Sequence, residues 1–119
     1  APASNGLLRF NTRNKALWAG VYTTSSLYSA PKSVVLSANV DSASSVKMRL
    51  NATSEGVSTE VSGLTMINAP VYIGRRGGTS LPFTGHLYSL IGIGRLTTDS
   101  ETITLEKAIA KNTGVTLNV

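Results

Sequence analysis

Apolar and polar residues alternate along most of the chain as far as about residue 96, and a period of two is typical of β-strands with one buried face. The clearest case is the segment 33–51, where two alternating runs flank the polar loop 41–44. A loop of that length predicts an antiparallel hairpin with one buried face and one wet face. The pattern predicts strands at 6–11, 16–23, 33–40, 45–51, 70–75 and 84–94, with a weaker strand within 56–62.

The alternation of apolar and polar residues ends before Thr98. Thr98 stands three residues before Glu101, and the pair fits the capping box that begins many helices. Leu105 and Ile109 lie four apart and share one helical face. The run Asn-Thr-Gly at 112–114 is a typical helix stop. The sequence therefore predicts a helix over 98–111, followed by a short extended tail at 115–119.

The composition supports a small β domain. The chain has 119 residues, enough for one domain, and 29 of them are serine or threonine while only 14% are charged. Abundant β-branched residues, together with glycines of the kind found in turns, favour an all-β structure. Cysteine is absent, which excludes disulfide scaffolds, thiolate zinc sites and thiol nucleophiles. No apolar run approaches the roughly 20 residues of a membrane span.

The charge is +5, and residues 1–54 hold six basic residues against one acid, Asp41. The basic residues are spaced singly, without the recognition helix or aromatic pair of nucleic-acid-binding modules, so no nucleic-acid partner is expected. The single histidine, His86, lies in an apolar run, and no nucleophile elbow or convergent acid pair occurs. We expect no enzyme activity, no metal and no cofactor.

Trp18 and Tyr22 are four residues apart, so both fall on one face of the predicted strand 16–23. An exposed face of this kind stacks on the apolar side of a sugar ring, and nearby hydroxyl, amide and guanidinium groups bond its hydroxyls. The alternative is that the two rings belong to the core. The pattern alone leaves both interpretations open.

Residues 70–91, PVYIGRRGGTSLPFTGHLYSLI, followed by the helix and KNTGV at 111–115, resemble the C-terminal part of concanavalin A-like (laminin G-like) jelly-roll modules. The versions in bacteriophage tail fibres and tailspikes are the most similar. The resemblance implies an antiparallel β-sandwich, a concanavalin A-like jelly roll with one short C-terminal α-helix. It also implies that residues 1–119 form a single lectin-like domain, a C-terminal fragment of a longer chain.

The resemblance implies a non-catalytic carbohydrate-binding and host-recognition domain of a phage tail fibre or tailspike. Its partner would be bacterial surface polysaccharide, and it would act extracellularly as part of the virion. The glucanases of the same superfamily carry a Glu-x-Asp motif that this chain lacks, so any depolymerase activity would lie upstream in the parent chain. The alternative is a structural module that trimerises or caps the fibre without binding sugar, because open sheet edges need partners.

Arg75 and Arg76 lie between glycines in the predicted turn 74–80. Guanidinium groups bind carboxylates bidentately, so these two arginines are candidates for reading acidic sugars, with Trp18 or Tyr22 as a stacking platform. The alternative is that one arginine pairs with Glu101 or Glu106 and the other is solvated.

Overall fold

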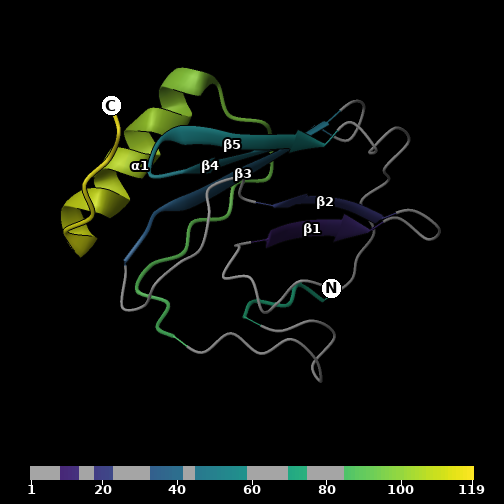
Figure 1. Cartoon of the computed structure of the whole chain (residues 1–119), viewed down its shortest axis with the longest axis horizontal. Coiled ribbons are helices and arrows are strands. Elements are labelled where there is room, and N and C mark those ends of the chain that lie inside the picture. The colour runs from purple at the N-terminus through teal and green to yellow at the C-terminus, as the bar shows by residue number, and fades with distance from the viewer. Residues whose placement is uncertain (1–8, 14–17, 23–32, 42–44, 59–69, 75–84) are drawn as a thin grey trace.

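The structure is a computed structural model, and it describes residues 9–13, 18–22, 33–41, 45–58, 70–74 and 85–119. Its elements, in chain order, are β1 (Arg9–Arg13), β2 (Trp18–Tyr22), β3 (Leu36–Asp41), β4 (Ser45–Leu50), β5 (Thr53–Ser58) and α1 (Asp99–Thr113) (Figure 1). β1 pairs with β2, and β3, β4 and β5 form a second sheet in that order. Every pairing is antiparallel. The predicted combination of antiparallel strands with one helix near the C-terminus is therefore confirmed.

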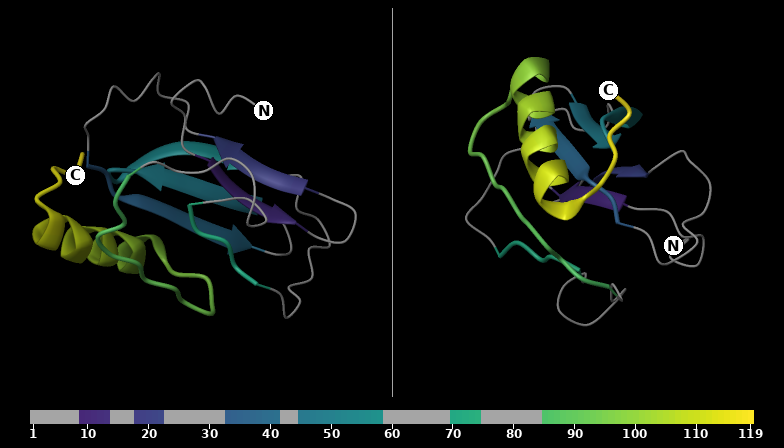
Figure 2. Two further views of the ribbon diagram at one scale, coloured as in Figure 1. Left: turned by 90° about the horizontal axis from the view of Figure 1, so that it is seen from below. Right: turned by 90° about the vertical axis from the view of Figure 1, so that its left-hand side faces the viewer.

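The elements form a layered arrangement around the three-stranded sheet. Figures 1 and 2 agree in placing α1 and the β1–β2 hairpin on opposite sides of that sheet. β2 lies near β4 and β5 but belongs to a separate hydrogen-bonded sheet. The helix and the hairpin therefore present separate surfaces to solvent.

The predicted hairpin at 33–51 is present as β3 and β4, with Val40 opposite Val46 and Leu36 opposite Leu50. Val46 and Met48 are fully buried and Leu50 is nearly so, whereas Lys47 between them is exposed. Alternation along β4 thus predicted the buried face. This face forms the centre of the described core.

A tight turn that the sequence pattern did not predict joins β4 to β5. Asn51 and Ala52 both have positive φ, at 48° and 70°, as a two-residue hairpin turn of type I′ requires. Asn51 also fastens this turn to the preceding chain, because its amide donates to the Val35 carbonyl at 2.8 Å and its side-chain oxygen accepts from the Val35 amide at 2.9 Å. β5 therefore starts at Thr53, and it overlaps the weak strand predicted within 56–62 only in part; residues 59–62 lie outside the described residues.

The predicted strands at 70–75 and 84–94 are wrong over the residues that the structure describes, 70–74 and 85–94, which are not in strands. These segments alternate as strands do, yet their large apolar side chains are exposed. No backbone hydrogen bond joins them to another described segment. The physical reason is that a strand forms only when its backbone hydrogen-bonds to a neighbouring strand, and apolar–polar alternation alone does not supply that neighbour.

The helix prediction is confirmed, with α1 running two residues further than expected, to Thr113. Thr98 is its N-cap and forms the predicted capping box with Glu101, and Gly114 at φ 72° ends it. The buried positions, however, are Thr102, Glu106 and Ala110, while Leu105 and Ile109 are only partly buried. The helix face that packs against the sheet is thus more polar than the sequence suggested.

Candidate functional site

The helix lies on the polar face of the β3–β4 hairpin, which the sequence predicted to be exposed to solvent. Arg49 donates two hydrogen bonds to Glu106, from Nε to Oε1 at 2.8 Å and from Nη2 to Oε2 at 3.0 Å. Ser37 donates a third bond to Glu106, whose side chain is 3% exposed. The hydrogen bonds that Arg49 donates to Glu106, together with the negative charge of Glu106, raise the pKa of Arg49 above its ordinary value. Because these bonds join residues of β3 and β4 to a residue of α1, the cluster holds the helix to the sheet.

A second polar cluster fixes the start of the helix to the same sheet face. The Asn39 amide donates to the Thr102 hydroxyl at 3.2 Å, and Thr97 donates to the Asn39 oxygen at 2.8 Å. Thr102 in turn donates to the Thr98 carbonyl at 2.9 Å. These bonds join β3, the segment before α1 and the first helical turn into one unit.

Glu101 at the helix start is paired with Arg95, through Nη2 to Oε1 at 2.8 Å and Nη1 to Oε2 at 2.9 Å. Glu101 also accepts from the Thr98 amide at 2.9 Å. The hydrogen bonds from Arg95, and then that from Thr98, lower the pKa of Glu101 from 4.5 to about 2. The capping box and the ion pair therefore depend on an ionised Glu101.

Acidification is expected to release this cap. Because the pKa of Glu101 is lower in the folded chain, its contribution to stability is fully present above pH 4.5 and is lost as the pH falls toward about 2. Thermal melts followed by circular dichroism over this range, on the wild type and Glu101→Gln, test this. The stability difference between the two should close as the pH falls. A difference that stays constant across the range would contradict the assignment.

A cavity of about 470 Å³ lies between the C-terminal end of α1 and the segment 85–96, and it is lined by Ser33, Tyr88, Ser89, Asn112 and Thr113. Tyr88 is 71% exposed. Its ring stacks on that of His86, with centroids 6.0 Å apart and planes 22° apart. The cavity thus combines an exposed aromatic ring with hydroxyl and amide groups that both donate and accept hydrogen bonds.

Two of the residues proposed from the sequence, Trp18 and Tyr22, are the first and last residues of β2. The register places Trp18 opposite Arg13 and Tyr22 opposite Arg9. Directly opposed residues share a face of an antiparallel pair, so both aromatic positions share their face with arginines. Nothing in the described contacts brings Trp18 or Tyr22 to the Tyr88 cavity.

The other two proposed residues, Arg75 and Arg76, lie outside the described residues. The alternative interpretation paired one of them with Glu101 or Glu106. Among the described side chains, those carboxylates pair with Arg95 and Arg49 respectively. The role of the 74–80 turn therefore remains a prediction from the sequence.

Sequence reasoning did not identify the Tyr88 cavity. Tyr88 falls within the predicted strand 84–94, and Ser33 and Asn112 stand 79 residues apart in the chain. The one available signal was an aromatic residue flanked by His86 and Ser89 in a run that leads to the helix. Only the tertiary arrangement brings the end of α1 next to Ser33.

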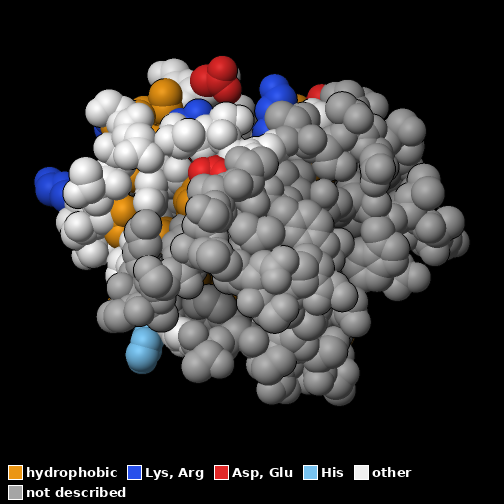
Figure 3. All heavy atoms as spheres, viewed as in Figure 1, with side chains coloured by type: hydrophobic (Ala, Val, Ile, Leu, Met, Phe, Trp, Pro, Cys, Tyr) orange, Lys and Arg blue, Asp and Glu red, His pale blue; other side chains and the backbone are white. Residues whose placement is uncertain are grey.

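The described residues contain no group of three or more His, Asp or Glu side chains that could hold a metal ion. No helix among them is long and apolar enough to cross a membrane. In Figure 3, the charged side chains of the described residues lie mainly over α1 and the three-stranded sheet, along the upper edge of the view. Comparisons with protein-family models, with curated proteins and with solved structures gave no match.

Proposed function

We propose that this chain is a non-catalytic carbohydrate-binding domain, and that it recognises bacterial surface polysaccharide as part of a phage tail fibre or tailspike. The observation that carries the carbohydrate proposal is the Tyr88 cavity. The phage assignment, with its place in the virion, rests on the sequence resemblance of residues 70–91 and 111–115. On the same ground we propose that the antiparallel sheets belong to a concanavalin A-like jelly roll.

The chemistry of the cavity suits a sugar. Its volume of about 470 Å³ falls within the usual range for small-ligand sites. The exposed Tyr88 ring offers an apolar face for the C–H side of a pyranose, as aromatic rings do for other flat apolar surfaces. Ser33, Ser89, Asn112 and Thr113 supply donors and acceptors for the ring hydroxyls.

We propose binding without hydrolysis. Glycoside hydrolysis generally uses two carboxylates on either side of the scissile bond. The described side chains that line the cavity are hydroxyl, amide and phenol groups. Groups of these kinds form hydrogen bonds and stacking contacts, which hold a saccharide but do not cleave it.

Tyr88→Ala tests the site. It should weaken polysaccharide binding roughly tenfold, about 1.4 kcal/mol, through loss of stacking and buried area. The melting temperature should hardly change, because Tyr88 is 71% exposed. Calorimetry against purified bacterial capsular polysaccharides and lipopolysaccharides, chosen from those that the wild type binds, gives the affinities.

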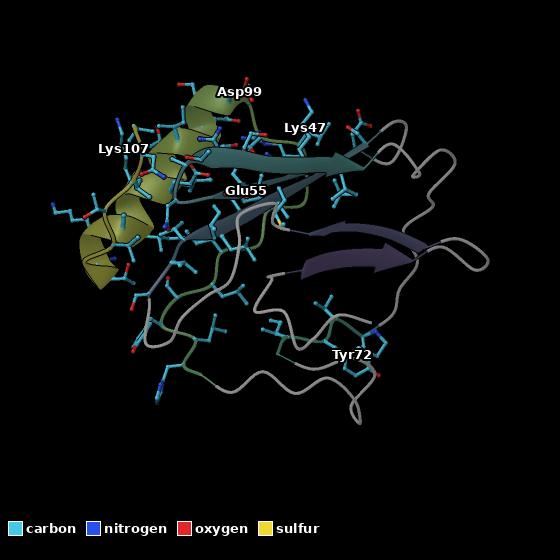
Figure 4. All side chains as sticks on the ribbon, in the orientation of Figure 1. Lys47, Glu55, Tyr72, Asp99 and Lys107 are labelled. Carbon is cyan, nitrogen blue, oxygen red and sulfur yellow. The ribbon has the colours of Figure 1, made fainter. Side chains whose placement is uncertain are left out.

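Two variants serve as controls for Tyr88→Ala. Tyr88→Phe keeps the ring and should keep most of the affinity. Tyr72→Ala removes another exposed tyrosine, 56% exposed and absent from the cavity lining, and should bind as the wild type does. Figure 4 places Tyr72 on the side of the molecule away from α1. Equal losses in Tyr88→Ala and Tyr72→Ala would refute the assignment of the cavity.

A second candidate function, a structural module that assembles with further copies of this chain, is favoured by the exposed apolar residues. Nine large apolar side chains, each 43–85% exposed, lie in 70–74 and 85–96. They are Val71, Tyr72, Ile73, Leu87, Tyr88, Leu90, Ile91, Ile93 and Leu96. Summed over the nine residues, the exposed area is roughly 1,000 Å², comparable with the area that one partner buries in a standard interface. This candidate requires a homotrimer that binds no polysaccharide.

A further inference from the structure

Asn112 supplies the amide group among the described side chains that line the Tyr88 cavity. It is exposed near the end of α1, and its side chain makes no hydrogen bond to another described residue. Its neighbour Thr113, in contrast, donates its hydroxyl to the Ile109 carbonyl at 2.9 Å. An asparagine amide holds two N–H donors and a carbonyl acceptor in one plane. These groups of Asn112 are therefore available to a ligand in the cavity.

The last turn of α1 also leaves backbone acceptors at this end of the helix. The last four carbonyls of an α-helix have no partner within the helix. The Ala110 carbonyl accepts from the Gly114 amide at 2.8 Å, whereas no described group donates to the carbonyls of Lys111, Asn112 and Thr113. Asn112 and Thr113 both line the cavity. A ligand there meets acceptors that need an N–H or O–H donor.

The charges at the end of α1 favour a neutral ligand group. Unpaired carbonyls give the C-terminal end of a helix a partial negative charge, which repels carboxylates. The same turn carries Lys111, whose positive charge repels ammonium groups. A neutral group that both donates and accepts hydrogen bonds meets neither penalty. The acetamido group of an N-acetylated sugar is such a group, and its C=O and N–H complement the N–H and C=O of an asparagine amide.

We infer that the Tyr88 cavity is specific for N-acetylated amino sugars, and that Asn112 is the residue that recognises their acetamido group. This inference rests on the proposed carbohydrate function and names its ligand class. Asn112 donates to the acetamido oxygen and accepts from the acetamido N–H, while the exposed Tyr88 ring packs on the pyranose and the acetamido methyl. A hydroxyl in place of the acetamido group is a single atom and cannot match both ends of the Asn112 amide.

The test compares neutral oligosaccharides that differ in one substituent. Chitotetraose and cellotetraose share their rings, linkage and charge, and differ in having an acetamido or a hydroxyl group at C2. Oligosaccharides ending in N-acetylgalactosamine or in galactose give a second pair. By calorimetry, the wild type should bind the acetamido member of at least one pair roughly tenfold more tightly, through the additional hydrogen bonding of the amide pair. Asn112→Ala should abolish this preference, and Tyr88→Ala should weaken the binding of both members alike.

Lys111→Ala is the matched control for Asn112→Ala. It truncates the neighbouring exposed residue of the same helical turn, which is not among the described lining residues, and it should keep the preference. The oligosaccharides are neutral, so the lost charge of Lys111 does not enter the comparison. Thermal melts should show little change in either variant, because both residues are exposed.

Several results would overturn the inference. These are equal binding of both members of every pair, no binding of any acetamido sugar, a preference that survives in Asn112→Ala, or the same loss in Asn112→Ala and Lys111→Ala. If polysaccharides bind through Tyr88 whether or not they carry acetamido groups, this inference fails and the proposed function stands. Absence of Tyr88-dependent binding to any glycan would contradict both.

Discussion

Glu106→Ala is expected to lower the free energy of unfolding by about 3 kcal/mol, because removing one partner of a buried ion pair leaves the other uncompensated. Glu106 is 3% exposed at its side chain and receives two bonds from Arg49 and one from Ser37. Arg49 is 22% exposed, so after the substitution it loses its partner in a place that water reaches only in part. Urea denaturation of the wild type and the variant measures the loss.

The double variant Arg49→Met with Glu106→Leu is the control for this prediction. Replacing both members of a buried pair by apolar residues of similar volume is often nearly neutral, so the double variant should be closer to the wild type than Glu106→Ala. A loss below about 1 kcal/mol in Glu106→Ala would contradict the account of how α1 is held.

Met48→Ala is expected to cost about 3 kcal/mol, the usual loss when a buried Met is truncated in a packed core. Met48 is fully buried at the centre of β4, with Val46 beside it on the same face. The matched control is Leu36→Ala, on the neighbouring strand but 39% exposed, which should cost clearly less. Chemical denaturation of both variants measures the two losses, and equal losses would show that the core lies elsewhere.

Local patterns predicted the elements that carry their own start and stop signals. Alternation on either side of the loop 41–44 predicted β3 and β4, and the Thr98–Glu101 capping box with Gly114 predicted α1. The turn at Asn51 and Ala52 was missed because it lacks the glycine that usually marks a type I′ turn. Ala52 adopts φ 70° although such a conformation is unfavourable for an alanine.

Features that depend on distant partners were not predictable from local patterns. The helix buries Glu106 instead of a purely apolar stripe because Arg49, 57 residues away, needs a carboxylate. Apolar alternation at 70–74 and 85–94 predicted strands, but no described segment pairs with them. The same limit applies to the candidate site, since Ser33 and Asn112 meet Tyr88 only through the tertiary fold.

For Trp18 and Tyr22, the structure shows which residues of β1 lie opposite them, and their spacing in the sequence did not. Their common face was predictable from the interval of four residues. The arginines opposite them were not, because the spacing within one strand does not set its register against the neighbouring strand. That register places Arg9 opposite Tyr22 and Arg13 opposite Trp18.

The central claim, that this chain binds bacterial polysaccharide without cleaving it, is tested most directly on an array of bacterial capsular polysaccharides and lipopolysaccharides, with light scattering on the same sample. The account predicts saturable binding to a defined subset of the glycans, reduced by Tyr88→Ala and retained by Tyr72→Ala, with no release of reducing ends. A well-folded trimer that binds none of the glycans would contradict the claim and establish the assembly function in its place.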